Sequence, residues 1–180
     1  MEVRLMELNL EQAFDGPVDL SQTFDVQRDR LARPELLSLA PVSFTGRLQK
    51  TEPGFILLGR INLSGAVACV RCLVEVPFER SASVSWTFAP AHEKPNEEDL
   101  ELASADLDIV WYDELRVPFD PLIEEQIQLE LPLKPLCQDA CRGLCPSCGA
   151  DRNTTPCDCV EPPDERWSAL KTLISPTPGS

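Results

Sequence analysis

The chain has 180 residues, of which 43% are hydrophobic, and its 16 Lys and Arg against 30 Asp and Glu give a net charge of −14. This composition excludes disorder throughout the chain, and the length accommodates one core with a small appended module. No apolar run approaches the roughly 20 residues that span a bilayer, so we expect no membrane partner, and the negative charge disfavours nucleic acid, which proteins bind through cationic contacts to phosphate.

The N-terminal residues do not have the basic region and apolar core of a secretory leader. Charged and apolar side chains are mixed between Met1 and Glu7. We therefore expect a cytoplasmic protein whose cysteines stay reduced.

Residues 42–88 alternate between apolar and polar side chains with the period of two that indicates half-buried β-strands. The clearest run lies at 74–88. Shorter runs lie at 42–48 and 61–67, and the turn signal Glu-Pro-Gly at 52–54 separates them. Together these runs predict an antiparallel meander.

Cys69 and Cys72 fall between two of the predicted strands, with two residues between them. That spacing lets both thiolates reach one metal ion from a single tight turn. We expect this knuckle to fix the end of a hairpin at one rim of the sheet.

An acidic segment and a helix follow the predicted sheet. Residues 93–108 contain seven acidic side chains and one Lys, which predicts a solvated surface loop; attraction of a basic partner is the alternative role. A short strand is expected at 107–112. Asp120 and Pro121 then provide the N-cap and first-turn proline of a helix at 120–131, whose apolar residues recur at the spacing of a core-facing amphipathic helix.

Six further cysteines follow the predicted helix in three close pairs: Cys137 and Cys141, Cys145 and Cys148, and Cys157 and Cys159. Four thiolates make one closed tetrahedral zinc site, so the eight cysteines of the chain supply two such sets. The run from Cys145 to Gly149 contains the proline and glycine that a tight knuckle favours. The last pair has only one intervening residue and makes a tighter, less usual knuckle.

Disulfides and redox chemistry are the competing interpretations of the cysteines. Disulfides require an oxidising compartment, which the N-terminal sequence does not indicate. A thioredoxin-like Cys-x-x-Cys motif belongs where a strand runs into a helix in an alternating pattern, and the flanks of these pairs do not offer that pattern. Structural zinc is therefore the preferred interpretation.

The sequence lacks the common catalytic templates. It contains no Gly-rich phosphate loop and no Gly-x-Ser-x-Gly elbow, and His92 is its only histidine, which leaves no triad and no open catalytic zinc site. We therefore predict that the chain is not an enzyme and takes no small-molecule substrate.

These elements predict an α+β fold: an antiparallel sheet or partly open barrel with one packed helix and a C-terminal cysteine-rich zinc-knuckle module. Residues 1–135 form the predicted β-rich domain, with the acidic loop at 93–108 and the helix at 120–131. Residues 136–160 form the predicted zinc-knuckle module. Residues 161–180 are expected to form a terminal helix and a disordered tail.

Four cysteine-containing motifs occur in a specific order along the chain. Cys-Val-Arg-Cys-Leu at 69–73 precedes the acidic segment and the helix, which leads into Leu-Pro-Leu-Lys-Pro-Leu-Cys at 131–137. The motifs at 141–149 and 157–159 follow. This order resembles the YceD family, a bacterial and plastid family named for large ribosomal RNA subunit accumulation. The resemblance implies a role in making or stabilising that RNA, without an established enzymatic activity.

The resemblance also suggests how the zinc ligands divide, since some relatives keep the first knuckle and lack the distal cysteines. We hypothesise two sets of ligands, Cys69, Cys72, Cys137 and Cys141 for one zinc ion and Cys145, Cys148, Cys157 and Cys159 for the other. The alternative is a single zinc ion held by four of the six distal cysteines, with the first pair as reduced thiols.

The resemblance and the negative charge together favour a non-catalytic assembly factor that binds a basic ribosomal protein or a precursor of the large ribosomal subunit. Arg71, Arg142 and Arg152 lie among the cysteines and are candidate partner-binding residues, with solvated side chains or ion pairs as the alternative. Direct zinc-dependent binding to ribosomal RNA is the second hypothesis. A thiol redox or zinc-storage protein is the third.

Overall fold

The structure is a computed structural model that describes residues 6–94, 109–160 and 166. Most of the acidic loop expected at 93–108 lies outside the described residues, as do the expected terminal helix and tail apart from Arg166. None of the helices in the described ranges has the length and apolar character needed to cross a bilayer.

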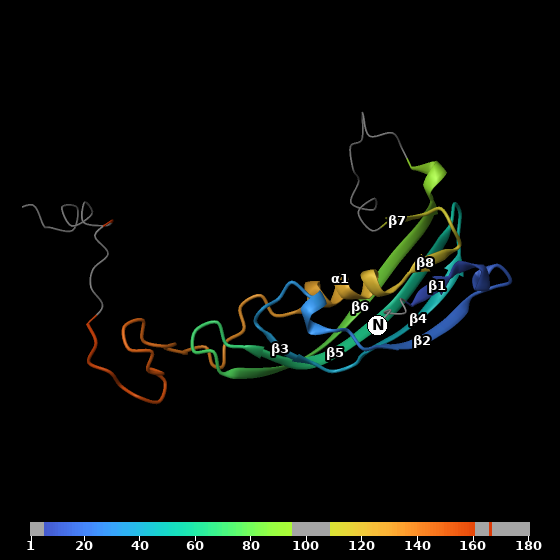
Figure 1. Cartoon of the computed structure of the whole chain (residues 1–180). Helices are drawn as coiled ribbons and strands as arrows, with labels where there is room; N and C mark the ends of the chain where they lie inside the picture. The colour runs from blue at the N-terminus through green and yellow to red at the C-terminus, as the bar shows by residue number, and fades with distance from the viewer. Residues whose placement is uncertain (1–5, 95–108, 161–165, 167–180) are drawn as a thin grey trace, which may run out of the picture.

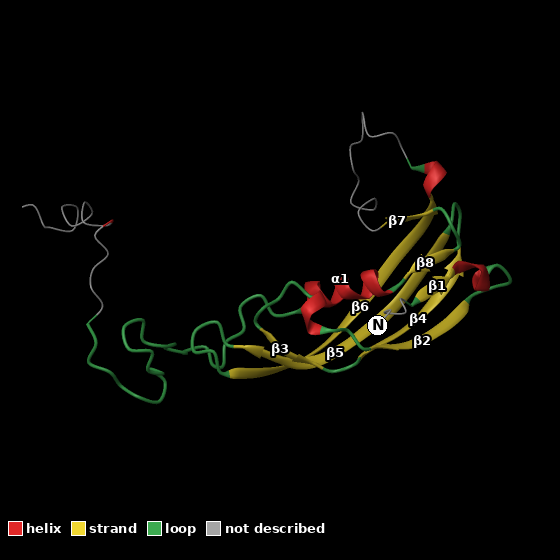
Figure 2. Cartoon of the chain, in the orientation of Figure 1, coloured by secondary structure: helices red, strands yellow, loops and turns green. Residues whose placement is uncertain are grey.

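The described chain folds mainly into β-strands with one α-helix (Figures 1 and 2). The strands are β1 (Glu7–Asn9), β2 (Val18–Phe24), β3 (Leu36–Leu39), β4 (Val42–Lys50), β5 (Phe55–Ala68), β6 (Glu75–Pro90), β7 (Ile109–Tyr112) and β8 (Arg116–Pro118). The helix is α1 (Asp120–Glu130), and the short 3-10 turns are η1 (Leu10–Ala13), η2 (Arg28–Arg30) and η3 (Ala91–Glu93).

A six-stranded sheet in the order β2-β4-β5-β6-β7 forms the body of the molecule, and β3 pairs with the C-terminal part of β5. Strands β4, β5 and β6 are antiparallel neighbours, so the predicted meander is confirmed. The predicted turn joins β4 to β5, where the Thr51 N–H donates to the Gly54 carbonyl at 2.8 Å. The first cysteine pair lies in the turn between β5 and β6, as expected.

The sheet is mixed and open, which corrects the expectation of a purely antiparallel sheet. Strand β7 runs parallel to β6, and the connecting residues 91–108 are more than the dozen that a parallel connection needs. The outer strands β2 and β7 do not pair with each other, so the sheet does not close into a barrel.

A second, two-stranded sheet of β1 and β8 was not foreseen from the sequence. Leu8 on β1 and Val117 on β8 are buried in the same core as the inward side chains of the large sheet. The Met6 N–H donates to Asp120 Oδ2 at 2.9 Å, which ties the start of β1 to the first turn of α1. This small sheet and α1 therefore cover one face of the large sheet (Figure 1).

Phe119, the residue before α1, lies at the centre of the core and is only 2% exposed. Its ring makes edge-to-face contacts with Phe24, Phe44 and Trp86 at centroid distances of 5.4, 5.2 and 5.8 Å. The ring of Phe44 in turn covers Gly59, where a Cβ would lie 2.5 Å from its Cε2 atom. One aromatic side chain thus joins the helix to three strands.

Helix α1 ends one residue before the predicted end at 131, and Phe119 rather than Asp120 occupies its N-cap position. Its buried face is the predicted one, since Ile123 and Ile127 are fully buried. Its C-terminal end is held by Arg33, whose guanidinium donates to the carbonyls of Gln128 at 3.3 Å and Pro132 at 2.8 Å. A cation at this end also satisfies unpaired carbonyls and the helix dipole. The contact fixes the direction in which the chain leaves the helix.

The Phe119→Ala variant should lose about 3–5 kcal/mol of unfolding free energy, because it removes a buried ring and leaves a cavity against three strands. Leu129→Ala is the matched control, since Leu129 is 70% exposed on the same helix and its truncation should change stability by less than about 0.5 kcal/mol. Urea unfolding followed by tryptophan fluorescence measures both. Similar losses in the two variants would contradict the central role of Phe119.

Candidate metal centres

The eight cysteines come together in two groups of four: Cys69, Cys72, Cys137 and Cys141, and Cys145, Cys148, Cys157 and Cys159. Within each group the sulfur atoms all lie within 4.8 Å of one another. All eight cysteines are free of disulfides. Each group contains the four cysteines that the two-ion hypothesis assigned to one zinc ion. Cys69 and Cys72 lie with two of the distal cysteines and are not a separate pair of thiols, as the one-ion alternative would have them.

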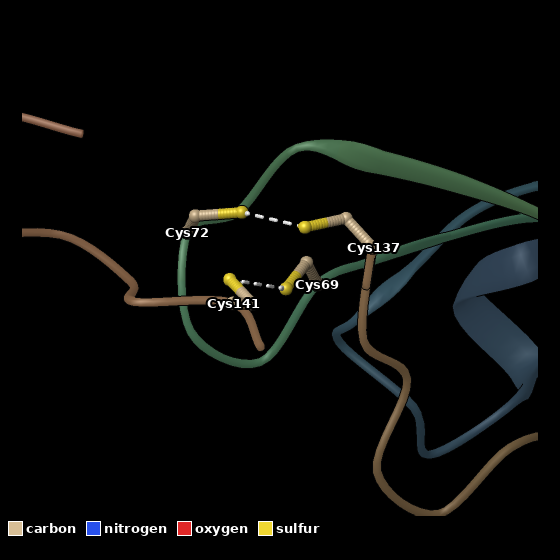
Figure 3. Close-up of side chains that lie close together, drawn as sticks. All are labelled: Cys69, Cys72, Cys137 and Cys141. Atoms are coloured by element: carbon tan, nitrogen blue, oxygen red, sulfur yellow. Dashed lines mark hydrogen bonds between the residues drawn. The ribbon is translucent and has the colours of Figure 1, made fainter. Parts of the chain in front are cut away.

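The first group joins the β5–β6 turn, which supplies Cys69 and Cys72, to the chain that follows α1, which supplies Cys137 and Cys141 (Figure 3). The sulfur atoms of Cys69 and Cys141 are 3.8 Å apart, and those of Cys72 and Cys137 are 3.5 Å apart. A tetrahedron with metal–sulfur bonds of about 2.3 Å has sulfur–sulfur edges of about 3.8 Å. The spacing fits four thiolates around one ion and is far longer than a disulfide bond of about 2 Å.

The thiols of the first group differ in acidity. Burial raises the pKa of Cys69, but hydrogen bonds from the backbone N–H groups of Cys72 and Arg71 more than offset it and lower the pKa to about 6. Loss of hydration and the neighbouring Cys72 thiol raise the pKa of Cys137 to about 12, although that residue is exposed as a whole. One thiolate is thus readily formed, and full ionisation of the group requires a cation among the sulfurs.

The second group lies in a more accessible place. Cys145 is buried, whereas Cys148 and Cys159 are exposed. Backbone N–H groups of Cys148 and Ser147 lower the pKa of Cys145 to about 6. The thiols of Cys148 and Cys145 raise the pKa of Cys159 to about 12. Each group therefore contains one thiol with a lowered pKa and one thiol with a raised pKa.

The knuckles at 69–74 and 145–150 have the same backbone hydrogen bonds. The N–H of Leu73 donates to the Cys69 carbonyl at 2.9 Å, and the N–H of Gly149 donates to the Cys145 carbonyl at 2.9 Å. Both residues have a left-handed backbone, with φ of 64° at Leu73 and 73° at Gly149. The glycine was expected in such a turn, whereas nothing in the sequence signalled that a leucine takes the same conformation.

The two groups are joined through Arg71. Its Nη1 atom donates to the Cys141 carbonyl at 2.7 Å, and its own carbonyl accepts from the Leu144 N–H at 3.0 Å. Gly143 packs directly on it, because a Cβ at Gly143 would lie 2.9 Å from the Arg71 carbonyl oxygen. The chain between the two groups therefore has a fixed path over the first knuckle.

Asn153 also links the two groups, a role that no motif in the sequence indicates. Its Nδ2 atom lies 3.5 Å from the Cys141 sulfur, and its Oδ1 atom accepts from the Arg142 N–H at 2.8 Å. An amide N–H directed at a ligand sulfur offsets part of the thiolate charge and orients the ligand. A residue beside the second group thus supports a cysteine of the first.

The three candidate partner-binding arginines have different environments. Arg71 contacts the Cys141 carbonyl, and Arg152 Nη2 lies 3.7 Å from the Cys145 sulfur. Arg142 is exposed, and its guanidinium has no partner among the described residues. Two of the three arginines therefore have contacts within the cysteine groups, and only Arg142 projects freely.

Comparison with known proteins places these features in a family. A family model for the large ribosomal RNA subunit accumulation protein YceD matches residues 57–174. The chain is 33% identical over 145 residues to a maize protein named large ribosomal RNA subunit accumulation protein YCED homolog 1, chloroplastic, covering 64% of this chain and 50% of the maize protein. The Arabidopsis thaliana protein of the same name is 31% identical over 109 residues, covering 56% of this chain and 34% of the relative.

Mycobacterial proteins are also similar to the chain. One from Mycobacterium tuberculosis, described only as uncharacterized, is 29% identical over 133 residues, covering 72% of this chain. The chain spans 60% of the length of that protein. No solved structure gives a significant match.

Two glycine substitutions test the junction between the groups. Gly143→Ala and Gly149→Ala both place a side chain at positive φ, which costs about 1–2 kcal/mol. Only Gly143→Ala also drives a Cβ against the Arg71 carbonyl, since nothing lies within 4 Å of a Cβ at Gly149. We expect Gly143→Ala to lower the thermal midpoint further and to speed amide hydrogen exchange at Leu144. Equal effects of the two variants would contradict a packed junction at Arg71.

Proposed function

This chain belongs to the YceD family of large ribosomal RNA subunit accumulation proteins, and we propose that it supports that accumulation by binding a basic ribosomal protein or a precursor of the large subunit. The family is implicated in the accumulation of large-subunit ribosomal RNA. The mode of action proposed here rests on the charge of the chain and on the engagement of its arginines.

The arginines of the described residues are largely occupied within the protein. Arg47 forms two hydrogen bonds with Asp19, at 2.7 and 2.9 Å, and Arg30 forms an ion pair with Glu124 at 3.0 Å. Arg33 donates to the Pro132 carbonyl just after α1, and Arg71 donates to the Cys141 carbonyl. A net charge of −14 with few unengaged arginines opposes phosphate binding and favours a basic protein.

The central strands of the sheet also lack a stacking platform for RNA bases. Single-stranded RNA is commonly held on exposed aromatic rings of a sheet. Within the central strands β4, β5 and β6 all aromatic side chains are buried: Phe44, Phe55, Phe78, Trp86 and Phe88. The outward side chains of β6 include Ser81, Ser83 and Ser85, which are exposed. These features favour protein recognition over direct binding of bare RNA.

We propose no catalytic step for the chain. Each cysteine group offers four thiolates, and four protein ligands close a tetrahedral site, so no position remains for a substrate or an activated water. The same closure argues against a redox or storage role, which needs a reactive thiolate that a partner can reach.

We propose that each cysteine group binds one structural Zn²⁺ ion. Two observations support zinc binding: each group contains four thiols, and the sulfur–sulfur distances in the first group fit a tetrahedral zinc site. Zinc bound there would neutralise part of the thiolate charge and hold the two chain segments of each group together. Such binding contributes directly to folding free energy.

Metal counting tests the zinc proposal. Elemental analysis of the purified protein should give two zinc ions per chain, and Cys72→Ser and Cys148→Ser should each remove one. Ser147→Ala, beside a ligand but not one itself, is the control and should keep both. Unchanged zinc content in either cysteine variant would contradict the assignment of that group.

Sedimentation tests the functional proposal. Tagged protein from gently lysed cells should travel with precursors of the large subunit, and it should bind proteins stripped from large subunits with salt. Bare large-subunit RNA is the comparison, and its binding should be weak and fall steeply with salt because it depends on counterion release. Protein that stays free of both particles and ribosomal proteins, even after crosslinking, would contradict the proposal.

A further inference from the structure

An exposed apolar patch lies at the tip of the first knuckle. Val70, Leu73 and Val74 are 51%, 64% and 49% exposed, and we call these three residues the knuckle-tip patch. They flank Cys72 in the β5–β6 turn, at the end of the sheet from which the cysteine-rich segment extends (Figure 1). Large apolar side chains gathered at one exposed turn commonly mark a site of interaction.

Leu73 is placed there against its own backbone preference. Its φ of 64° is the left-handed conformation that glycine adopts without steric cost and leucine does not. The second knuckle has Gly149 at the same position, with the same hydrogen bond to the first cysteine of the pair. Folding alone would therefore favour glycine at position 73, so the exposed leucine side chain needs another explanation. Residues with a strained backbone of this kind cluster at binding sites.

The patch is rigid before any partner arrives. The Val74 carbonyl accepts from the Cys69 N–H at 2.8 Å, and the Val70 N–H donates to the Pro135 carbonyl at 3.0 Å. Cys69 and Cys72 on either side of Val70 belong to the first cysteine group. A patch held in this way loses little conformational freedom on binding, which strengthens docking.

Acidic side chains lie beside the patch, on a chain whose net charge is −14. Glu75 follows it directly, and Asp139 lies in the chain between two cysteines of the same group; both are exposed. Four thiolates around a dication add a net charge of −2. The nearby cations include Lys134, Arg71 and Arg142, of which Arg71 is bonded to the Cys141 carbonyl. A partner that covers the patch must therefore tolerate or prefer negative charge.

We infer that the knuckle-tip patch is the docking site for an apolar side chain of a basic ribosomal protein, with Leu73 as its central contact. The inference rests on the proposed function and names the surface that performs it. Charge complementarity selects this occupant, since a second copy of the chain would bring another net charge of −14 to the same place. RNA would meet negative charge and no exposed aromatic ring there.

Three variants separate the side chain of Leu73 from its backbone. Leu73→Gly removes both the side chain and the steric cost, whereas Leu73→Ala removes the side chain and keeps a Cβ at positive φ. Leu129→Ala is the control, because Leu129 is a similarly exposed leucine on α1. The probe is the protein fraction released by salt from purified large ribosomal subunits, and binding and thermal unfolding are measured for each variant.

Both Leu73 variants should bind the released proteins at least about tenfold more weakly, as expected for a central interface contact. Leu73→Gly should unfold at the same or a higher temperature than the unaltered protein, so lost binding cannot be ascribed to misfolding. Leu129→Ala should bind normally. Unchanged binding by Leu73→Gly, when the unaltered protein binds, would overturn the docking site and leave the proposed function standing.

A photoreactive benzoylphenylalanine at position 73 identifies the occupant directly. A covalent product with one basic ribosomal protein, absent when the same group is placed at position 129, is the expected result. Products with RNA or with a second copy of the chain would overturn the inference, and so would the absence of any product. If the unaltered protein binds neither precursor particles nor released ribosomal proteins, the proposed function fails together with the docking site.

Discussion

The meeting of four sulfur atoms from two distant chain segments is the constraint on which the end of the molecule depends. Cys69 and Cys72 come from a hairpin, and Cys137 and Cys141 come from the chain beyond the helix. Thiolates separated by 3.5–3.8 Å repel one another strongly unless protons or a cation intervene. A bound dication would convert that repulsion into a crosslink between the sheet and the segment that follows α1.

The sheet and helix deliver the sulfurs to this point. Phe119 anchors the start of α1 among the rings of three strands, and Arg33 holds its last carbonyls. Leu131 is buried directly after the helix, and the Pro135 carbonyl then accepts a hydrogen bond from the N–H of Val70. The chain is therefore already alongside the first knuckle two residues before Cys137. The aromatic core therefore helps to set the position of the first cysteine group.

The parts of this fold that the sequence predicted are those with a local signature. Alternating side chains indicated β4 to β6, helical spacing and Pro121 indicated α1, and cysteine spacing indicated the knuckles. The direction of β7 and the pairing of β1 with β8 depend on contacts between distant segments, for which a short strand has no pattern of its own. The bonds of Asn153 to Cys141 and Arg142 were missed for the same reason, since they exist only once the two groups are packed together.

The two cysteine groups do not depend on each other equally. The first is built on the hairpin of the sheet, and its buried members Cys69, Cys72 and Cys141 are packed with half-buried apolar side chains. The second is connected to the rest through Arg71 and Asn153, both of which contact Cys141 of the first. Loss of the second group would leave the hairpin and its ligands in place, whereas loss of the first would detach the second from the sheet. The buried group is therefore the structural base, and the exposed group depends on it.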